Sequence, residues 1–436
     1  MNVRETALAL LLLHEGSDTY INLALSSHKA DGLTPEERGI LTVLLYTVTE
    51  KRITYDYYIG ALAKRSPDDI HPRTRSILRL GLCQIVDMEK IPDFAAVNET
   101  VKLAKNKGER AFVNGVLRAA VREKDSLPMP DKKKNAARYY SVKYSLPLGI
   151  VKHFLSSLGE EESVKLFCAF NSHSPTDLTV NTLKVSVGEY LDMLKEKGYN
   201  ATRVDLSEIT VRIYGSVNPR NLPGYDEGLF FVQDAACAIC ASALGAMAGE
   251  RIADVCSAPG GKSFAIGILT SDRADVRSFD LHESKLSLIE SGSARLGLRS
   301  VSVAQRDATS PDASLFGSFD RVLCDVPCSG LGVIAKKPDL RYGSLDAMTA
   351  LPPLQLEILR ASAGYLKPGG TLVYSTCTLN KAENEDVVSA FLAENTDFTP
   401  EDFTAGSISS EGGMLTTYPH IHNTDGFFIC KLRKNK

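Results

Sequence analysis

Two cysteines in the C-terminal half of the chain follow segments that are typical of buried strands. Cys328 ends the sequence LCDVPC at residues 323–328, and Cys377 ends the sequence LVYSTC at residues 372–377. Ligands of open parallel sheets bind at the carboxyl edge of the strands, so we expect both thiols to lie beside a ligand. A thiolate at such a site can add to an electrophilic ring, which is covalent catalysis. Cys324 lies within its strand, and we interpret it as a small core residue.

Cytosine is a ring on which this chemistry is useful. Its C-5 becomes nucleophilic only after a thiolate has added to C-6, and it can then attack the methyl group of a sulfonium. The adduct must afterwards lose the C-5 proton and expel the sulfur, which a second thiol can assist. Asp325 precedes Cys328 by three residues and can stabilise the adduct at the N-3 edge of the pyrimidine.

A loop containing two glycines follows the first expected strand of this half. The strand covers residues 251–256, and the sequence SAPGGK at 257–262 leads into a helix. Gly260 and Gly261 let a ligand approach the backbone, and the helix N-terminus offers free N–H groups. Pro259 removes a donor that a pyrophosphate would use, and the spacing is not that of a P-loop. These features favour a nucleoside without phosphates, such as S-adenosylmethionine, over an ordinary tight turn.

Two aspartates end the next expected strands. Asp280 lies twenty residues after Gly260, where a carboxylate can bind both hydroxyls of a ribose. Asp307 ends the third strand and is placed to reach the edge of an adenine. A nucleoside cofactor would therefore lie across the ends of three strands.

The composition is that of an ordinary globular protein with more than one domain. The chain has 436 residues, of which 44% are hydrophobic and 24% charged. Nine cysteines show no paired framework, which fits a reducing compartment, and no apolar segment reaches the length of a membrane span. Cys324 and Cys328 lack the further ligands that a zinc site would need. We expect a monomeric cytoplasmic protein without a metal.

Basic residues are concentrated in one part of an otherwise acidic chain. Residues 102–152 hold 13 Lys or Arg and 4 Asp or Glu, a local net charge of +9, although the whole chain has a net charge of −3. Such a segment is a candidate footprint for a polyanion. The alternative is a solvated linker, which is the simpler interpretation of residues 132–134 alone.

The patterns along the chain predict four parts. Residues 1–125 have the three- and four-residue apolar spacing of helices. Residues 126–150 contain three prolines and many lysines and predict a basic linker. Residues 151–233 mix helices and strands in a small α+β module. Residues 234–436 alternate strands and helices, which predicts a doubly wound, mainly parallel sheet. Its expected strands are 251–256, 276–280, 300–307, 319–325, 371–377 and 426–433.

The motifs together resemble a known enzyme family. The sequences DVCSAPGGKS (254–263), DVPCSG (325–330) and STCT (375–378) are similar to those of the Sun/Fmu-type RNA cytosine C-5 methyltransferases. The likeness extends through GVI (332–334), KPD (337–339) and DGFF (425–428), and so covers nearly all of residues 234–436. It implies a Rossmann-like class I methyltransferase with a seven-stranded sheet and S-adenosylmethionine as cofactor.

The resemblance also implies roles for individual residues. Cys377 would be the nucleophile, Cys328 would assist release of the product, and Asp325 would lie between cofactor and base. The cofactor would contact Asp280, Asp307 and a loop formed by Cys256, Ser257, Ala258, Pro259, Gly260, Gly261 and Lys262. The chemistry of the residues alone leaves the two thiols interchangeable, because the DNA cytosine methyltransferases use the cysteine of their own Pro-Cys motif.

The N-terminal part resembles the NusB-like helical RNA-binding domain. The sequences IPDFAAVNE (91–99) and FVNGVLR (112–118) carry this likeness. In this family the combination implies bacterial small-subunit (16S) rRNA as the substrate, with Lys336, Lys337 and Arg341 along the RNA path. A tRNA methyltransferase with the same chemistry and a non-catalytic RNA-binding assembly factor are the competing hypotheses.

Overall fold

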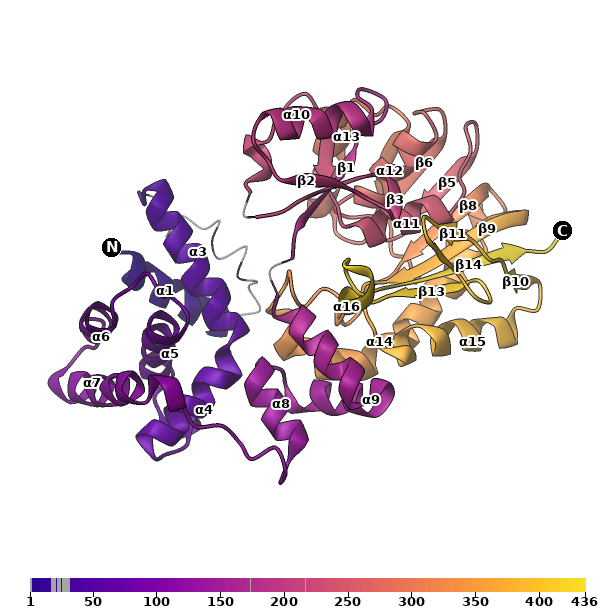
Figure 1. The fold of residues 1–436 in the computed structure, drawn as a ribbon. Helices are drawn as coiled ribbons and strands as arrows, with labels where there is room; N and C mark the ends of the chain where they lie inside the picture. The colour runs from indigo at the N-terminus through magenta and orange to yellow at the C-terminus, as the bar shows by residue number, and fades with distance from the viewer. Residues whose placement is uncertain (1, 17–20, 22–24, 26–31, 173, 216) are drawn as a thin grey trace. The chain divides into compact units, whose positions relative to one another are not determined.

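The computed structural model of the protein divides into two compact units (Figure 1). The first consists of Met1–Asn171 and Lys337–Tyr342, and the second of Ser172–Lys336 and Gly343–Lys436. The structure describes residues 2–16, 21, 25, 32–172, 174–215 and 217–436.

Among its described residues the first unit contains helices and no strands, which agrees with the helical expectation for residues 1–125. Helix α3 illustrates why these segments fold locally. Thr34 and Glu37 form a capping box at its N-terminus, Pro35 occupies the first turn, and Leu41 and Leu45 on its inner face are fully buried. Its larger helices are α1 (Val3–Gly16), α3 (Pro35–Glu50), α4 (Arg52–Ala63), α5 (Pro72–Val86), α6 (Asp93–Val101), α7 (Lys107–Arg122), α8 (Ala136–Tyr144) and α9 (Leu148–Phe170).

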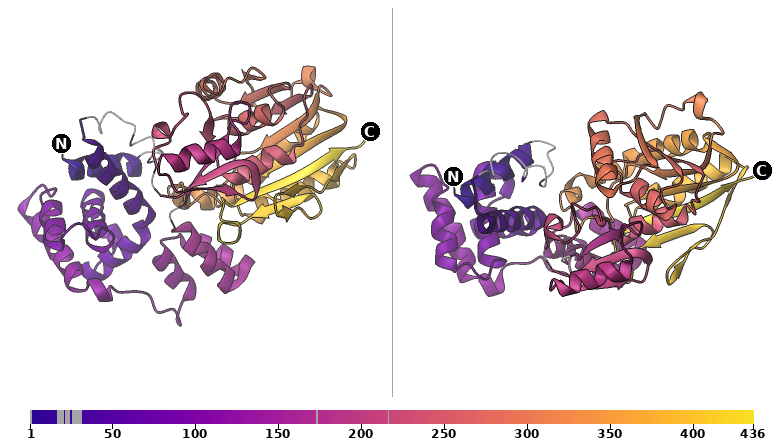
Figure 2. Two further views of the ribbon diagram at one scale, coloured as in Figure 1. Left: turned by 45° about the horizontal axis from the view of Figure 1, so that its top comes forward. Right: turned by 90° about the horizontal axis from the view of Figure 1, so that it is seen from above.

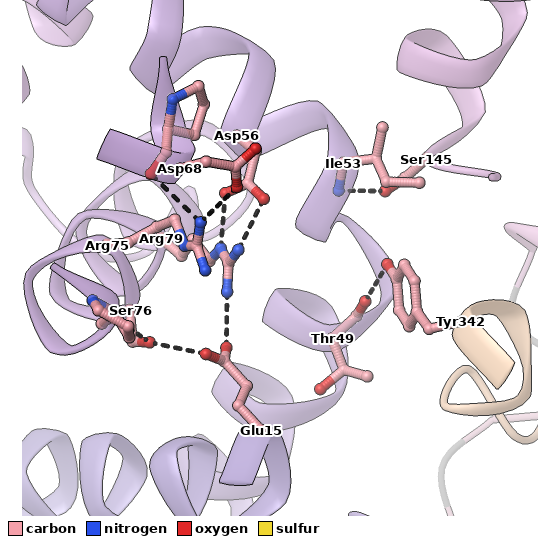
Figure 3. Close-up of polar contacts among 12 residues, drawn as sticks. Glu15, Thr49, Ile53, Asp56, Asp68, Arg75, Ser76, Arg79, Ser145 and Tyr342 are labelled. Atoms are coloured by element: carbon pink, nitrogen blue, oxygen red, sulfur yellow. Dashed lines mark hydrogen bonds and ion pairs between the residues drawn. The ribbon is translucent and has the colours of Figure 1, made fainter. Parts of the chain in front are cut away.

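A buried arginine joins three of these helices (Figure 3). Arg79 on α5 is 2% exposed, and its guanidinium donates two parallel hydrogen bonds to Asp56 on α4, of 2.7 and 2.6 Å. A third bond, of 2.6 Å, reaches Glu15 on α1. A buried guanidinium is tolerated only where carboxylates compensate for its lost hydration, so these contacts specify how the helices pack.

The segment that we expected to be a linker contains a helix. Asn135 caps α8 by accepting a hydrogen bond from the backbone N–H of Arg138. Tyr140 and Tyr144 on α8 pack against Phe167 on α9, with ring centroids 6.4 and 5.7 Å apart. The prolines and lysines dominated the sequence pattern, whereas these aromatic contacts hold α8 in place.

The first unit also includes a short segment from much later in the chain. Tyr342 donates a hydrogen bond of 2.6 Å to the backbone carbonyl of Thr49 (Figure 3), and His14 lies 3.4 Å from Asp339. Arg341 is 1% exposed and donates to the Phe170 carbonyl at 2.7 Å and to Asn171 Oδ1 at 2.8 Å. Burial lowers the pKa of Arg341 from its ordinary value. Its guanidinium is committed to the protein interior, which corrects our expectation that it faces RNA.

The second unit contains a small antiparallel sheet with the strand order β2-β3-β1-β4. Its strands are β1 (Thr176–Val180), β2 (Ala201–Val204), β3 (Ser207–Ile213) and β4 (Phe230–Val232), and helix α10 (Val187–Glu196) packs against it. Arg212 and Asp177 form a buried bidentate ion pair on neighbouring strands, with bonds of 2.6 and 2.7 Å. This arrangement agrees with the α+β module that we expected here.

The larger sheet is mainly parallel, as expected. Seven strands follow the order β10-β14-β9-β8-β5-β6-β7, and β13 adds an eighth beside β14. Five neighbouring strands, in the order β9-β8-β5-β6-β7, are parallel to one another. β14 pairs antiparallel with β9, β10 and β13. The strands are β5 (Arg251–Asp254), β6 (Asp275–Asp280), β7 (Val301–Gln305), β8 (Phe319–Asp325), β9 (Leu366–Thr376), β10 (Phe398–Pro400), β13 (Met414–Thr417) and β14 (Phe427–Lys434).

Helices cover both faces of this sheet (Figure 2). Alternate residues of each strand point to opposite faces, so Ile252 packs in one hydrophobic core and Ala253 in the other. One core includes α11 (Ala235–Ala243), α12 (Gly261–Leu269) and α13 (Glu283–Leu296), and the other includes α14 (Leu340–Ala363) and α15 (Glu385–Glu394). None of the described helices combines the length and the apolar character that a bilayer span requires.

Arg341→Ala should destabilise the first unit by about 3 kcal/mol, because it leaves buried carbonyl groups without a donor and opens a cavity. Lys337→Ala is the matched control, since this exposed neighbour lies in the same short segment. Its effect should stay within about 0.5 kcal/mol. Urea unfolding followed by circular dichroism measures both, and equal losses of stability would contradict this assignment of the buried guanidinium.

Candidate active site

The expected functional residues gather where four parallel strands end. β5, β6, β8 and β9 are successive neighbours in the sheet when read as β6-β5-β8-β9. Asp325, the last residue of β8, pairs in register with Ser375 near the end of β9. The segments that follow these two strands therefore leave the sheet side by side.

The two cysteine thiols meet at this edge. Cys328 Sγ lies 3.0 Å from Cys377 Sγ, and the backbone N–H of Cys377 donates to Cys328 Sγ at 3.2 Å. Both residues are partly exposed, whereas Cys324 is fully buried, as expected of a core residue. The pair is thus both accessible and close enough to exchange a proton.

The surroundings of Cys328 disfavour its thiolate. Its hydrogen bond with Cys377, followed by burial and the nearby Glu383 carboxylate, holds the pKa of Cys328 well above its ordinary value. These contacts favour the neutral form of the Cys328 thiol.

Asp325 is held between the glycine loop and the cysteine loops. Lys262 donates to its Oδ2 at 2.6 Å, and the Ser375 hydroxyl donates to its Oδ1 at 2.8 Å. Burial alone would lower the pKa of Lys262, but Asp325 and neighbouring groups raise it well above its ordinary value. Lys262 is consequently a permanent cation and keeps Asp325 oriented at the centre of the site.

The glycine loop has the close approaches that its composition predicts. Gly260 has φ +106°, and a Cβ atom there would lie 2.6 Å from the Phe264 ring. A Cβ atom on Gly261 would lie 2.9 Å from the Gln233 amide. Asp280 accepts the backbone N–H of Ala258 at 3.2 Å, which ties the loop to the end of β6. Ser257 donates both its N–H and its hydroxyl to the Phe279 carbonyl.

A buried carboxylate beneath this loop lacks one partner. Asp254, the last residue of β5, is 1% exposed and accepts a hydrogen bond of 2.6 Å from Ser263. Its Oδ1 is buried without a hydrogen-bond partner. Burial raises the pKa of Asp254 to about 7, and the negative charges of Asp325 and Asp280 act in the same direction. A positively charged ligand would relieve this unfavourable environment.

Four other predicted residues do not join this cluster in the same way. Asp307 is exposed and accepts hydrogen bonds from Thr309 in its own turn, which lower its pKa. Cys256 is partly buried two residues after the end of β5, and burial raises its pKa well above the ordinary value. Lys337 is exposed in the first unit, where Arg341 is buried.

Lys336 is engaged by carboxylates of its own unit. Its ammonium group pairs with Asp234 and, at 3.0 Å, with Asp425. Burial would lower the pKa of Lys336, but the two aspartates raise it. The side chain is 31% exposed, so its cation stabilises the loop after Cys328 while remaining partly accessible.

Sequence reasoning missed a buried polar network behind the thiols. Glu383 is fully buried and accepts hydrogen bonds from Ser329, Gln355 and Asn380. The segment NKAE (380–383) has the spacing of a helix capping box, a pattern that would have explained this glutamate without function. Its position six residues after Cys377 was the available signal.

A close backbone contact was also missed. Gly332 N–H donates to the Cys377 carbonyl at 3.0 Å, and Gly426 N–H donates to the Gly332 carbonyl at 2.9 Å. A Cβ atom on Gly332 would lie 1.8 Å from the Gly426 carbonyl oxygen. Only glycine fits, so the motifs GVI (332–334) and DGFF (425–428) are held together beside Cys377.

The site is built from thiols, carboxylates and one lysine. Within the described part of the chain, no group of three or more His, Cys, Asp or Glu side chains is arranged to hold a metal ion. Adjacent thiols beside a glycine loop with a ribose-binding type of carboxylate suit covalent catalysis on a bound ring next to a nucleoside cofactor.

Comparison with known families agrees with the three-part architecture. The NusB family matches residues 1–122, an RsmF/B-like ferredoxin-like domain matches 147–219, and the family described as 16S rRNA methyltransferase RsmB/F matches 241–433. The chain is therefore a NusB-type helical domain, a ferredoxin-like domain and a C-terminal class I methyltransferase domain.

Relatives of similar length support this assignment. "Probable ribosomal RNA small subunit methyltransferase B" of Bacillus subtilis is 37% identical over 99% of both chains, and "Ribosomal RNA small subunit methyltransferase B" of Vibrio vulnificus is 32% identical over 100% of both. The crystal structure of PH0851 has the same fold, with a TM-score of 0.82 and 24% identity over 100% of this chain and 99% of that one. A methyltransferase homologue from Pyrococcus horikoshii covers 69% of this chain and 99% of its own, with a TM-score of 0.60 and 28% identity. The chain belongs to the RsmB/F family of 16S rRNA methyltransferases.

Proposed function

We propose that this protein transfers a methyl group from S-adenosylmethionine to C-5 of a cytosine in small-subunit rRNA, through a covalent adduct between a cysteine and C-6. The observation that carries the proposal is the pair of thiols 3.0 Å apart, beside Asp325 and on the edge of the sheet that holds the glycine loop. Family membership supports the choice of rRNA over tRNA, and the intact thiol pair argues against a non-catalytic assembly factor.

The surroundings of the glycine loop carry the negative charge that would stabilise a sulfonium. S-adenosylmethionine would supply an electrophilic methyl group on a positively charged sulfur. Asp254, Asp280 and Asp325 bring three carboxylates close to the glycine loop, and the orphaned Oδ1 of Asp254 lies among them. Asp280 would hold the ribose, residues 256–262 the methionine end and Asp307 the adenine edge.

Cys377 would act as the nucleophile. Its thiolate sulfur forms a bond to C-6 of the cytosine, which moves electron density to C-5 and allows C-5 to take the methyl group. Asp325, oriented by Lys262, would contact the ring at its N-3 edge and stabilise the adduct. The resemblance to the RNA cytosine C-5 methyltransferases supports this division of roles.

Cys328 would assist the release of the product. After methylation a base removes the C-5 proton, and the electrons of that C–H bond re-form the ring double bond as the bond between C-6 and Cys377 Sγ breaks. With the two sulfurs 3.0 Å apart, the Cys328 thiol can pass a proton to the departing sulfur. One thiol attacks and the other facilitates its departure.

The first unit carries the charge that RNA docking requires. All 13 Lys and Arg side chains of residues 102–152 are exposed. Such groups supply affinity for the phosphate backbone without selecting a base. The target cytosine must in addition be unstacked before it can reach the thiols.

The function itself is tested in cells that lack the protein. Bisulfite sequencing of their rRNA should show the loss of one 5-methylcytosine from the small subunit, and expression of the intact protein should restore it. An unchanged small-subunit pattern would remove the rRNA proposal, and loss of a tRNA modification instead would favour the competing hypothesis.

Asp280→Asn should weaken the binding of S-adenosylmethionine about tenfold to a hundredfold, because hydrogen bonds to a charged acceptor contribute about 1.5–3 kcal/mol. Asp275→Asn, at the opposite end of the same strand, is the matched control and should bind normally. Isothermal titration calorimetry measures both affinities. Equal affinity of Asp280→Asn and the wild type would remove the ribose assignment.

The roles of the two thiols are separated by their alanine variants. Cys328→Ala should form the bond to C-6 but release it slowly, so that a covalent protein–RNA adduct accumulates on denaturing gels. Cys377→Ala should form no adduct, and both variants should lose turnover by about a hundredfold or more. The reverse pattern would exchange the two assignments.

A further inference from the structure

Glu383 is a buried carboxylate whose position requires a structural or functional explanation. It is fully buried, and an ionised carboxylate in a protein interior is costly unless donors satisfy both oxygens. Oε1 accepts hydrogen bonds from Ser329 Oγ and from Asn380 Nδ2 at 3.0 Å. Oε2 accepts them from Ser329 N at 2.8 Å and from Gln355 Nε2 at 3.0 Å.

Helix capping does not explain these contacts. In a capping box the glutamate accepts the backbone N–H of the cap residue. Here the cap residue is Asn380, and its N–H donates to Thr378 Oγ1 at 3.3 Å instead. Glu383 is turned toward Ser329, which is 54 residues away in the sequence.

On one side the network brackets Cys328. Ser329, the next residue, donates both its N–H and its hydroxyl to Glu383. Gln355 donates to the Pro327 carbonyl at 2.9 Å as well as to Glu383, so the residue before Cys328 is held through the same amide. Both peptide neighbours of this thiol are thereby tied to one carboxylate.

On the other side the network holds the segment after Cys377. Thr378 Oγ1 lies 2.8 Å from Ser329 Oγ, and Asn380 donates directly to Glu383. Asn384, the next residue after Glu383, donates to the Thr378 carbonyl at 3.0 Å and accepts the Thr376 hydroxyl. The neighbours of Cys377 on both sides are therefore fixed by residues 383 and 384.

We propose that Glu383 is a positioning residue for methyl transfer, whose buried carboxylate ties the Cys328 loop to the Cys377 loop and so sets the distance and alignment of the two thiols. This inference rests on the proposed function. Glu383 is fully buried and acts through the loops that it holds.

Its charge also acts on the Cys328 thiol. The Glu383 carboxylate acts electrostatically on Cys328 and Tyr374, and the Tyr374 hydroxyl donates to the Glu383 backbone carbonyl at 2.6 Å. The carboxylate contributes to raising the pKa of Cys328. Removal of this negative charge should therefore weaken both the geometry and the preference for a protonated Cys328.

Glu383→Gln tests the proposal with little change in shape. The amide group of a glutamine has only one oxygen, so its N–H₂ group must face hydrogen-bond donors in either orientation of the amide. These donors are Ser329 N and Gln355 in one orientation and Asn380 in the other. We expect methyl transfer in a single turnover to slow at least tenfold, because small misplacements of reacting groups cost about that much or more. KM for S-adenosylmethionine and RNA affinity should stay within about twofold of wild type.

Adduct formation gives an independent readout. Small-subunit rRNA transcribed with 5-fluorocytidine cannot lose its C-5 substituent as a proton, so the covalent adduct persists and its rate of formation can be followed on denaturing gels. Glu383→Gln should slow this rate in parallel with methyl transfer. Asp386→Asn is the matched control, since this exposed carboxylate lies three residues later and should change neither rate.

The outcomes are distinguishable. Wild-type rates in Glu383→Gln, or a loss of RNA or cofactor affinity that accounts for the slower rate, would overturn the positioning role. If Glu383→Gln does not fold, Gln355→Met removes one donor and leaves the carboxylate, and it should still slow adduct formation; a wild-type rate there would overturn the proposal as well. Absence of methyl transfer by the wild type would instead refute the proposed function.

Discussion

The register of two neighbouring strands is the constraint on which the site depends. β8 and β9 are parallel, and Asp325 at the end of one pairs with Ser375 near the end of the other. A parallel pair sends both chains out of the sheet at the same edge, so Cys328 and Cys377 meet although 49 residues separate them. A shift of one residue in β9 would turn Ser375 away from Asp325 and move the thiol to the other face.

Two buried carboxylates near this edge show how hydrogen-bond satisfaction separates structural from ligand-binding groups. Glu383 has donors at both oxygens and is complete without a ligand. Asp254 has one donor and one orphaned oxygen, and burial raises its pKa to about 7. A carboxylate with one unsatisfied oxygen beneath a glycine loop can interact with a cationic ligand. A carboxylate whose two oxygens are both hydrogen-bonded makes its surroundings more rigid. On the proposed function, Asp254 would help to hold the methyl donor and Glu383 would keep the thiols in position.

Local patterns in the sequence predicted the elements that local physics determines. The strands, the glycine loop and the two cysteines follow from apolar runs and from residues that alter the backbone, and the structure has β8 at the predicted residues 319–325. β5 and β7 end at Asp254 and Gln305, two residues before their predicted ends, so Asp307 lies in the turn after its strand. The burial and the partners of Glu383, Lys336 and Arg341 depend on groups that are distant in the sequence. Any local sequence window predicts an exposed Arg341 because the residue is charged, yet its partners Phe170 and Asn171 lie about 170 residues earlier. No local rule contains that contact.

The cations of the two units differ in their surroundings. Lys262 and Lys336 are bound by carboxylates of the second unit, where they orient the residues around the thiols. The exposed cations of residues 102–152 belong to the first unit. Salt screens exposed charges far more than buried pairs, so on the proposed function RNA affinity and the chemical step respond differently to ionic strength. On the proposed function, a change in ionic strength would therefore alter the affinity for rRNA without altering the geometry of the thiols and carboxylates.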